Sequence, residues 1–132
     1  MQDFKKTIKI AASDEEVYDA LTKPFAIELW TGAKAVMDTT PGSEFELWDG
    51  DICGQNLEFQ PNQLIRQEWY FGDEEQQSVV TFKIRRLSAS RTELYVVHTN
   101  IPDEAYDNIV DGWLNSYLEP LRHFLEDGDE ED

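Results

Sequence analysis

Cysteine, basic residues and long hydrophobic runs are all scarce in this chain of 132 residues. Cys53 is its one cysteine, so no disulfide can form within the chain and no site with several thiolate ligands is available. No hydrophobic run approaches the ~20 residues that a membrane-spanning helix needs. The first residues also lack the basic-then-hydrophobic pattern of a secretion signal, and we therefore expect a cytoplasmic protein.

The charge is strongly one-sided. Lys and Arg number 11 against 28 Asp and Glu, which gives a formal net charge of -17. A field of that sign repels phosphate backbones and anionic lipids, so we expect neither nucleic acid nor a membrane as partner. A small hydrophobic ligand or a protein with a basic surface remains compatible with the charge. The charge also has a plain explanation, because it keeps a protein in solution.

Motifs of common enzyme and metal sites are missing as well. The chain has no glycine-rich phosphate loop, no cluster of metal ligands, and no serine or cysteine triad order. The sequence therefore identifies no catalytic residues, and we expect no metal and no cofactor. The hydrophobic fraction of 40% and the aromatic fraction of 12% suffice for a packed core. We place one domain at residues 1–126 and an acidic, disordered tail at residues 127–132.

Local patterns predict an opening strand, two short helices, a series of strands and a long final helix. Thr7 to Ile10 alternate as in a half-buried strand, and Ser13 with Glu16 forms a capping box. Pro24 ends the first short helix and begins the second. Further strands are expected at residues 33–37, 44–48, 52–59, 64–71, 78–87 and 92–99, with a hairpin turn at Asp49-Gly50 and a polar loop at residues 72–75.

Hydrophobic residues recur at steps of three and four from Tyr106 to Leu125, which predicts a helix about 34 Å long. Asp103 is expected to cap this helix and Pro120 to bend it near Ser116. So wide a hydrophobic stripe needs a broad partner, and the sheet of six or seven strands must curl around it. The fold class is therefore α+β, a curved antiparallel sheet wrapped around one long C-terminal helix, called helix-grip. The last two strands should point inward through Val80, Phe82, Ile84, Leu94, Val96 and His98.

This geometry tends to leave a gap between the helix and the concave face of the sheet. The candidate lining residues are mostly aromatic, and they either surround a pocket for a hydrophobic or aromatic ligand or simply fill the core. Both interpretations stay open. The candidates are Trp30, Phe45, Leu47, Cys53, Trp69, Phe82, His98, Trp113 and Tyr117.

Four polar or reactive residues have two interpretations each. His98 inside the cavity is either a ligand-orienting group or general base, or a histidine with satisfied hydrogen bonds in the core. Cys53, at an expected inward strand position, is a reactive thiol or a small core residue. Asp49 and Asp51 suggest calcium ligands, but turn formation explains them fully. His123 is expected at the surface.

The order of elements resembles the START-like superfamily, which is also called birch-pollen-allergen-like. More narrowly, the chain is similar to the C-terminal domain of activators of the heat-shock chaperone ATPase and to their bacterial single-domain relatives. The resemblance runs from Lys9 to about Leu125. It rests on the helix end at Trp30-Thr31 and on residues 13–22 (SDEEVYDALT), 45–54 (FELWDGDICG), 61–70 (PNQLIRQEWY), 92–102 (TELYVVHTNIP) and 112–125 (GWLNSYLEPLRHFL).

The resemblance implies structural roles for its motif residues. Gly50 and Gly54 would serve turn and bulge geometry, and Trp113 would pack the helix on the sheet. Eukaryotic activators carry an additional N-terminal domain, for which we expect this chain to have no room. The resemblance alone therefore does not imply that this chain stimulates the chaperone ATPase.

We consider three functions, in this order of preference. The first is a non-enzymatic domain that binds a small hydrophobic ligand. The second is a protein-interaction domain that resembles a co-chaperone, and the third is an enzyme with His98 as base.

Overall fold

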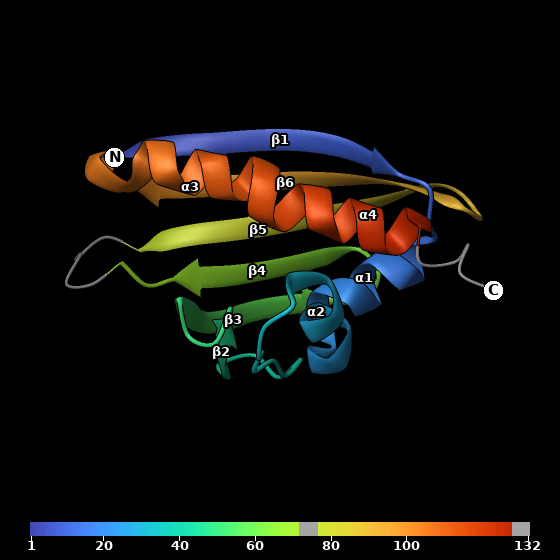
Figure 1. The fold of residues 1–132 in the computed structure, drawn as a ribbon, viewed down its shortest axis with the longest axis horizontal. Coiled ribbons are helices and arrows are strands. Elements are labelled where there is room, and N and C mark those ends of the chain that lie inside the picture. Colours follow the sequence, from blue (N-terminus) through green and yellow to red (C-terminus); the bar gives the residue numbers. More distant parts are fainter. Residues whose placement is uncertain (72–76, 128–132) are drawn as a thin grey trace.

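The computed structural model describes residues 1–71 and 77–127, and the strands of this part form one curved antiparallel sheet. Six strands pair in the order β1-β6-β5-β4-β3-β2, so consecutive strands are neighbours except that β1 pairs with β6 (Figure 1). The predicted α+β helix-grip class is confirmed. The strands are β1 (Gln2–Ile10), β2 (Glu44–Leu47), β3 (Ile52–Gln60), β4 (Leu64–Trp69), β5 (Ser78–Ser88) and β6 (Arg91–Ile101).

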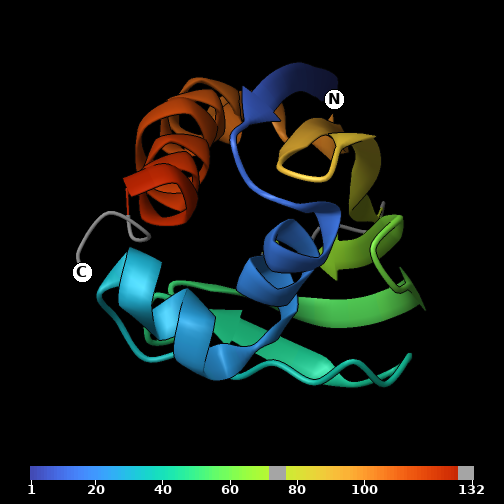
Figure 2. The ribbon, with the colours of Figure 1, turned by 90° about the vertical axis from the view of Figure 1, so that its right-hand side faces the viewer.

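Two short helices follow β1, and a long helix ends the described chain. This C-terminal helix runs without a break through η1 (Asp103–Ala105), α3 (Tyr106–Gly112), η2 (Trp113–Leu118) and α4 (Glu119–Asp127), and the short helices are α1 (Asp14–Thr22) and α2 (Pro24–Thr31). Seen along the strands, the C-terminal helix lies on the concave side of the sheet, with α1 and α2 beside it (Figure 2). No helix of the described residues is long and apolar enough to cross a membrane.

The capping box predicted at the start of α1 is present. The Ser13 hydroxyl accepts the Glu16 N–H at 3.1 Å, and the Glu16 carboxylate accepts the Ser13 N–H at 3.1 Å. Two amide donors at the helix start are thereby satisfied. Pro24 then occupies the first turn of α2, also as predicted.

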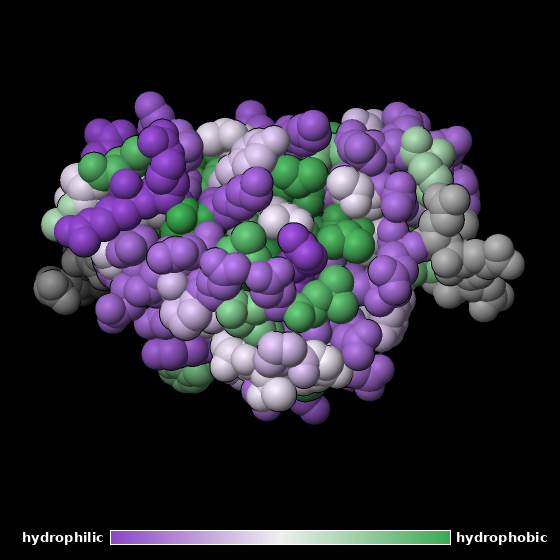
Figure 3. Space-filling view, turned by 180° about the vertical axis from the view of Figure 1, so that it is seen from behind, coloured by the Kyte–Doolittle hydropathy of each residue, from purple (hydrophilic) through white to green (hydrophobic). Residues whose placement is uncertain are grey.

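Alternation along β5 and β6 sends one set of side chains to the core and the other to solvent. The outer face of the sheet is largely hydrophilic, with hydrophobic residues in small separate groups (Figure 3). An antiparallel sheet covered on one side follows this pattern. All six predicted inward residues are buried: Val80, Phe82, Ile84, Leu94, Val96 and His98.

The strand predicted at residues 33–37 is wrong. Only Val36 pairs, in one isolated bridge with Glu46. The chain turns away immediately afterwards, because the Asp38 carboxylate accepts both the N–H and the hydroxyl of Thr40. Pairing therefore ends after one residue, and this segment lies beside β2 without extending the sheet.

The long helix begins and continues differently from the prediction. The Asp103 carboxylate makes no capping hydrogen bond and instead binds the N-terminal ammonium at 2.9 Å. The first turn is a 3₁₀ turn, which tightens a helix end that has no side-chain cap. The irregularity expected near Ser116 takes the form of a wider π-helical segment, Trp113–Leu118, in the turn before Pro120. Proline has no N–H to donate to that turn.

Two predictions fall largely outside the described residues. These are the polar loop at residues 72–75 and the acidic tail, of which Asp127 alone is described, as the end of α4.

Strand β1 lies at one end of the sheet, and its outer edge pairs with no strand among the described residues. It carries Lys5, Lys6 and Lys9, which are part of the small basic complement of the chain.

Gly54 lies on β3, between β2 and β4. Its register is continuous, opposite Phe45 on one side and Trp69 on the other, so the expected role in a bulge is wrong. The bulge of β3 lies further along, between Asn56 and Glu58. A Cβ on Gly54 would collide with the Glu68 carbonyl oxygen and lie 2.9 Å from the Phe45 ring. Glycine is therefore required for close approach, whereas Gly50 (φ 97°) serves the turn as expected.

Replacement of Gly54 by alanine tests this close approach. Gly54→Ala should lower the free energy of unfolding by about 3 kcal/mol, because the Glu68 backbone must move. Gly112→Ala is the matched control: a Cβ there meets nothing within 4 Å in a helical backbone. It should raise the free energy of unfolding by about 0.5–1 kcal/mol. Urea denaturation measures both, and equal stability of the two variants would contradict the packing argument.

Candidate functional site

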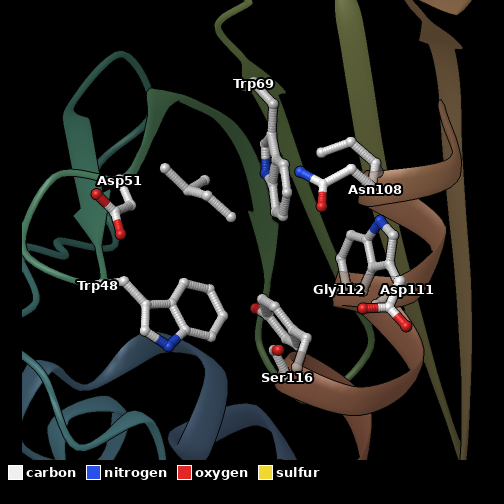
Figure 4. Close-up of a pocket in the computed structure, with 11 residues that line it drawn as sticks. Trp48, Asp51, Trp69, Asn108, Asp111, Gly112 and Ser116 are labelled. Carbon is white, nitrogen blue, oxygen red and sulfur yellow. The ribbon is translucent and has the colours of Figure 1, made fainter. Parts of the chain in front are cut away.

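A pocket opens between the turn joining β2 to β3, the end of β4 and the C-terminal helix (Figure 4). Its volume is about 410 Å³, which lies within the usual range for small-molecule sites. Aromatic and aliphatic side chains make most of the wall, and polar side chains stand among them. The lining residues are Trp48, Asp51, Ile52, Trp69, Asn108, Ile109, Asp111, Gly112, Trp113, Ser116 and Tyr117.

Three aromatic rings on β4 and the C-terminal helix pack as one group. Trp69 stacks on Trp113 with centroids 5.0 Å apart and planes inclined by 19°. Tyr117 lies 4.6 Å from Trp113 and 6.3 Å from Trp69. Trp113 and Tyr117 are four residues apart on the helix, so both face the sheet. The three residues therefore form one packed aromatic group at the base of the pocket, and each of them is only 2–4% exposed.

The indole of Trp113 is held by a buried chain of hydrogen bonds. Its Nε1–H donates to Nδ1 of His98 at 2.9 Å. Nδ1 must then be unprotonated, so Nε2 carries the imidazole proton and donates to the Ser78 hydroxyl at 2.7 Å. Ser78 in turn donates to the Thr99 carbonyl at 3.1 Å. Every polar group in this series of hydrogen bonds has a partner, and the series joins the C-terminal helix to β5 and β6.

His98 is neutral in this arrangement. The side chain is fully buried, and burial lowers the pKa of His98 from 6.5 to about 4, against a small opposing effect of Asp3. A general base needs a free lone pair, and the lone pair of His98 accepts the Trp113 N–H. The geometry supports the core interpretation of His98 and gives no support to an enzyme that uses it as base.

A second buried network holds Trp69. Its Nε1–H donates to the Gln67 side-chain oxygen at 3.1 Å, and the Gln67 amide donates to the Asn56 side-chain oxygen at 3.1 Å. Asn56 donates onward to the Asp38 carbonyl and the Ser43 hydroxyl, each at 3.1 Å. Gln67 and Asn56 are 2% and 0% exposed, so these bonds form away from competing water.

Trp48 reaches the pocket through an unusual backbone conformation. It begins the turn after β2 with φ 51°, and Asp49 follows with φ 56°. A left-handed conformation costs about 1–2 kcal/mol for a residue of this size. Contacts on the inner side offset that cost, because the indole packs edge-on against Trp30 at 6.1 Å and Tyr117 at 5.8 Å.

The pocket carries acidic side chains at its rim and one hydroxyl in its depth. Asp51 and Asp111 are exposed and lie on opposite sides of the opening in Figure 4. The Tyr117 side chain is 4% exposed, and its hydroxyl forms no hydrogen bond within the described part of the chain. Burial raises the pKa of Tyr117 above its usual value, so the phenol stays protonated. Its oxygen and proton are both available to a molecule in the pocket.

The structure brings some of the predicted candidates to the pocket and leaves others in the core. Trp69, Trp113 and Tyr117 line it. Behind them stand Trp30, Phe82 and His98, whose rings pack on those of the wall. Phe45 and Leu47 are each 1% exposed in the core and do not line the pocket.

The expected inward position of Cys53 is wrong. Cys53 pairs with exposed Glu46, so both point to the outer side, whereas Gly54 and Phe45 face inward. The thiol is half-buried on the outer side of β3 and away from the pocket. Regular alternation along residues 52–59 would put Cys53 on the same side as Phe59, which pairs with buried Ile65, but the bulge between Asn56 and Glu58 reverses the alternation.

Several lining residues were not candidates from the sequence. Alternation along residues 44–48 puts Trp48 on the outer face, and only the left-handed turn reverses it. Asn108, Asp111 and Ser116 flank the hydrophobic stripe of the helix and do not belong to it. The available signal was the Asp49-Gly50 hairpin, which marks the β2–β3 turn but not its position beside the helix.

The comparisons with known proteins agree with the fold. A model of the family described as "Activator of Hsp90 ATPase homolog 1-like protein" matches residues 11–126. The "Activator of 90 kDa heat shock protein ATPase homolog" of Dictyostelium discoideum is 25% identical over 126 residues, covering 89% of this chain and 32% of that protein. This chain thus spans about a third of the length of the curated relatives it matches.

Solved structures show the same architecture. An Hsp90 activator from Plasmodium falciparum superposes with a TM-score of 0.84 at 24% identity, covering 90% of this chain and 92% of that one. A protein from Mesorhizobium loti gives 0.82 at 24% identity, covering 99% of both chains. Likeness at this level of identity establishes the fold and leaves function to the site.

The neutral, buried state of His98 predicts how stability depends on pH. Its folded pKa is depressed below 6.5, so the unfolded chain binds the proton first as the pH falls. The contribution of His98 is complete above the unfolded pKa and is lost as the pH falls toward 4. Between about pH 7 and about pH 5, this loss should reach about 2 kcal/mol of unfolding free energy.

His98→Asn keeps an acceptor near the Trp113 N–H and removes the titration. Urea denaturation across this range should show a shallower pH dependence for His98→Asn than for the native chain. Identical slopes for His98→Asn and the native chain would show that the imidazole is not held neutral.

Proposed function

We propose that this chain, which belongs to the family of Activator of Hsp90 ATPase homolog 1-like proteins, binds a small hydrophobic or aromatic molecule in the pocket beneath its C-terminal helix. One observation carries the proposal: the pocket is open although its wall is aromatic. Its volume of about 410 Å³ and its lining of hydrophobic and polar side chains suit a small molecule.

The buried networks explain why the wall does not close. Moving Trp113 inward would break its bond to His98, and moving Trp69 would break its bond to Gln67. Each move would leave a buried polar group unsatisfied, at about 1–3 kcal/mol. The indoles are therefore fixed before any ligand arrives, and a fixed site binds without the entropy cost of ordering its walls.

Native mass spectrometry of gently purified protein tests this function. We expect an added mass of a few hundred daltons that is lost on denaturation, or binding of added hydrophobic compounds that is measurable by calorimetry. Gly112→Leu should abolish either signal, because Gly112 lines the pocket and has open space at its Cβ. Glu119→Leu, on the same helix but outside the pocket, is the matched control and should bind like the native chain. Equal binding by the two variants would place the ligand elsewhere.

A protein partner is the second candidate, and the surface of α2 favours it. Phe25 and Leu29 stand one helical turn apart with 74% and 57% of their surface exposed. Together with the family membership and the net charge of -17, this surface suits a heat-shock chaperone or another protein with a basic patch. The first function has the stronger support, because a formed pocket specifies its occupant more closely than two exposed side chains do. A cytoplasmic location fits both functions and stays a prediction.

A pull-down with a purified 90 kDa heat-shock chaperone separates the two candidates. A chaperone-binding domain should retain the partner at low salt and release it as the salt concentration rises, since screening weakens charge-steered association. Phe25→Ser with Leu29→Ser should weaken retention by about tenfold, as loss of a hydrophobic anchor does. Leu87→Ser, an exposed leucine on β5, is the control. No retention at any salt concentration would remove the chaperone from consideration.

A further inference from the structure

The charge lining the pocket restricts what its occupant can be. Asp51 stands on the β2–β3 turn and Asp111 on α3, and neither forms an ion pair within residues 1–71 and 77–127. All 11 Lys and Arg residues of the chain are described, and none of them lines the pocket. A carboxylate or phosphate ligand would therefore meet two like charges and no counter-charge.

The aromatic wall also favours a positively charged ligand. The faces of Trp and Tyr rings carry negative potential, and a cation within about 6 Å of a ring centroid is attracted to it. Trp48, Trp69, Trp113 and Tyr117 border the pocket from three separate elements. Half-buried Trp48 is the most accessible of the four, because the other three are only 2–4% exposed. Sites that recognise organic ammonium groups commonly combine several aromatic faces in this way.

The Tyr117 hydroxyl adds a polar anchor at depth. It is 96% buried by difference from its 4% exposure, and no described residue bonds to it. A protonated phenol offers its oxygen lone pairs to a donor such as an ammonium N–H. The oxygen is not among the fully buried atoms, so it reaches the pocket, where a ligand can supply the missing hydrogen bond.

A metal ion is the alternative cation, and the donor set disfavours it. Among residues 1–71 and 77–127, no group of three or more His, Cys, Asp or Glu side chains is placed to hold a metal. Calcium requires six to eight oxygen ligands, far beyond the two carboxylates here. The aromatic and aliphatic residues of the lining also have no use in a metal site, whereas they suit the carbon frame of an organic cation.

We propose that the pocket selects an organic cation, namely an ammonium group on a small hydrophobic or aromatic frame. This proposal rests on the pocket being a ligand site. Asp51 and Asp111 attract the charge at the rim, the aromatic rings hold the frame, and the Tyr117 hydroxyl accepts a hydrogen bond from the ammonium group. The volume of about 410 Å³ limits the ligand to a small molecule or to the end of a side chain.

Isothermal titration calorimetry with three probes on one phenylalkyl frame tests the selection by charge. The probes are phenethylammonium, the neutral hydrocarbon propylbenzene and the anion hydrocinnamate. We expect phenethylammonium to bind about tenfold more tightly than propylbenzene, and hydrocinnamate to bind more weakly than both. Added salt should weaken the binding of phenethylammonium and leave that of propylbenzene unchanged.

Three variants assign the preference to residues. Asp51→Asn and Asp111→Asn should each weaken phenethylammonium binding by about threefold and leave propylbenzene binding unchanged. Tyr117→Phe removes only the hydroxyl and should also weaken the ammonium probe alone. Asp107→Asn is the control, because Asp107 is exposed on the same helix α3 but does not line the pocket. Thermal melting of each variant confirms that the fold is kept.

The outcomes separate this inference from the proposed function. If all three probes bind equally, or if hydrocinnamate binds best, the selection for a cation is wrong and the pocket remains a ligand site. If calcium chloride displaces phenethylammonium through Asp51 and Asp111, the site is a metal site and the inference is also wrong. If no probe binds and Gly112→Leu leaves every titration unchanged, the proposed function itself fails.

Discussion

The hydrogen bond from the Trp113 indole to the His98 imidazole joins the C-terminal helix to the sheet, at 2.9 Å and away from water. The helix could otherwise slide or rotate along a hydrophobic face, because hydrophobic contact has little directional preference. A directed bond at one ring fixes the rotation of the helix, and through it the positions of Asp111 and Tyr117. The wall of the pocket, its rim and its depth therefore depend on an imidazole that never touches the pocket.

Two buried polar networks also fix the shape of the pocket. Trp69 is fixed through Gln67 and Asn56, as Trp113 is through His98 and Ser78. Buried polar groups are costly unless every member is satisfied, and no described buried side-chain atom lacks a partner. The polar residues of the core thus fix the positions of the aromatic side chains, and those positions leave the pocket open.

Much of the fold follows from the sequence, and less of the site does. The inward set of β5 and β6 and the length of the last helix follow from periodicity, and the capping box follows from Ser13 and Glu16 three residues apart. All of these are local properties of the sequence. Trp48 and Cys53 could not be placed in this way, since a left-handed residue and a bulge each reverse strand parity. The rim residues Asn108 and Asp111 belong to the site only because the C-terminal helix packs on the sheet in one rotational orientation about its axis. That rotation is a tertiary property that no single window of sequence contains.

The unpaired outer edge of β1 bears on how copies of this chain meet. An exposed strand edge is a template on which other strands can add, and such addition is the first step of fibril growth. Two copies that met through β1 in antiparallel register, centred on Lys6, would place Lys6 of one opposite Lys6 of the other. Three of the 11 basic residues of an acidic protein therefore lie at the edge where like charges resist polymerisation, and the net negative charge keeps whole molecules apart.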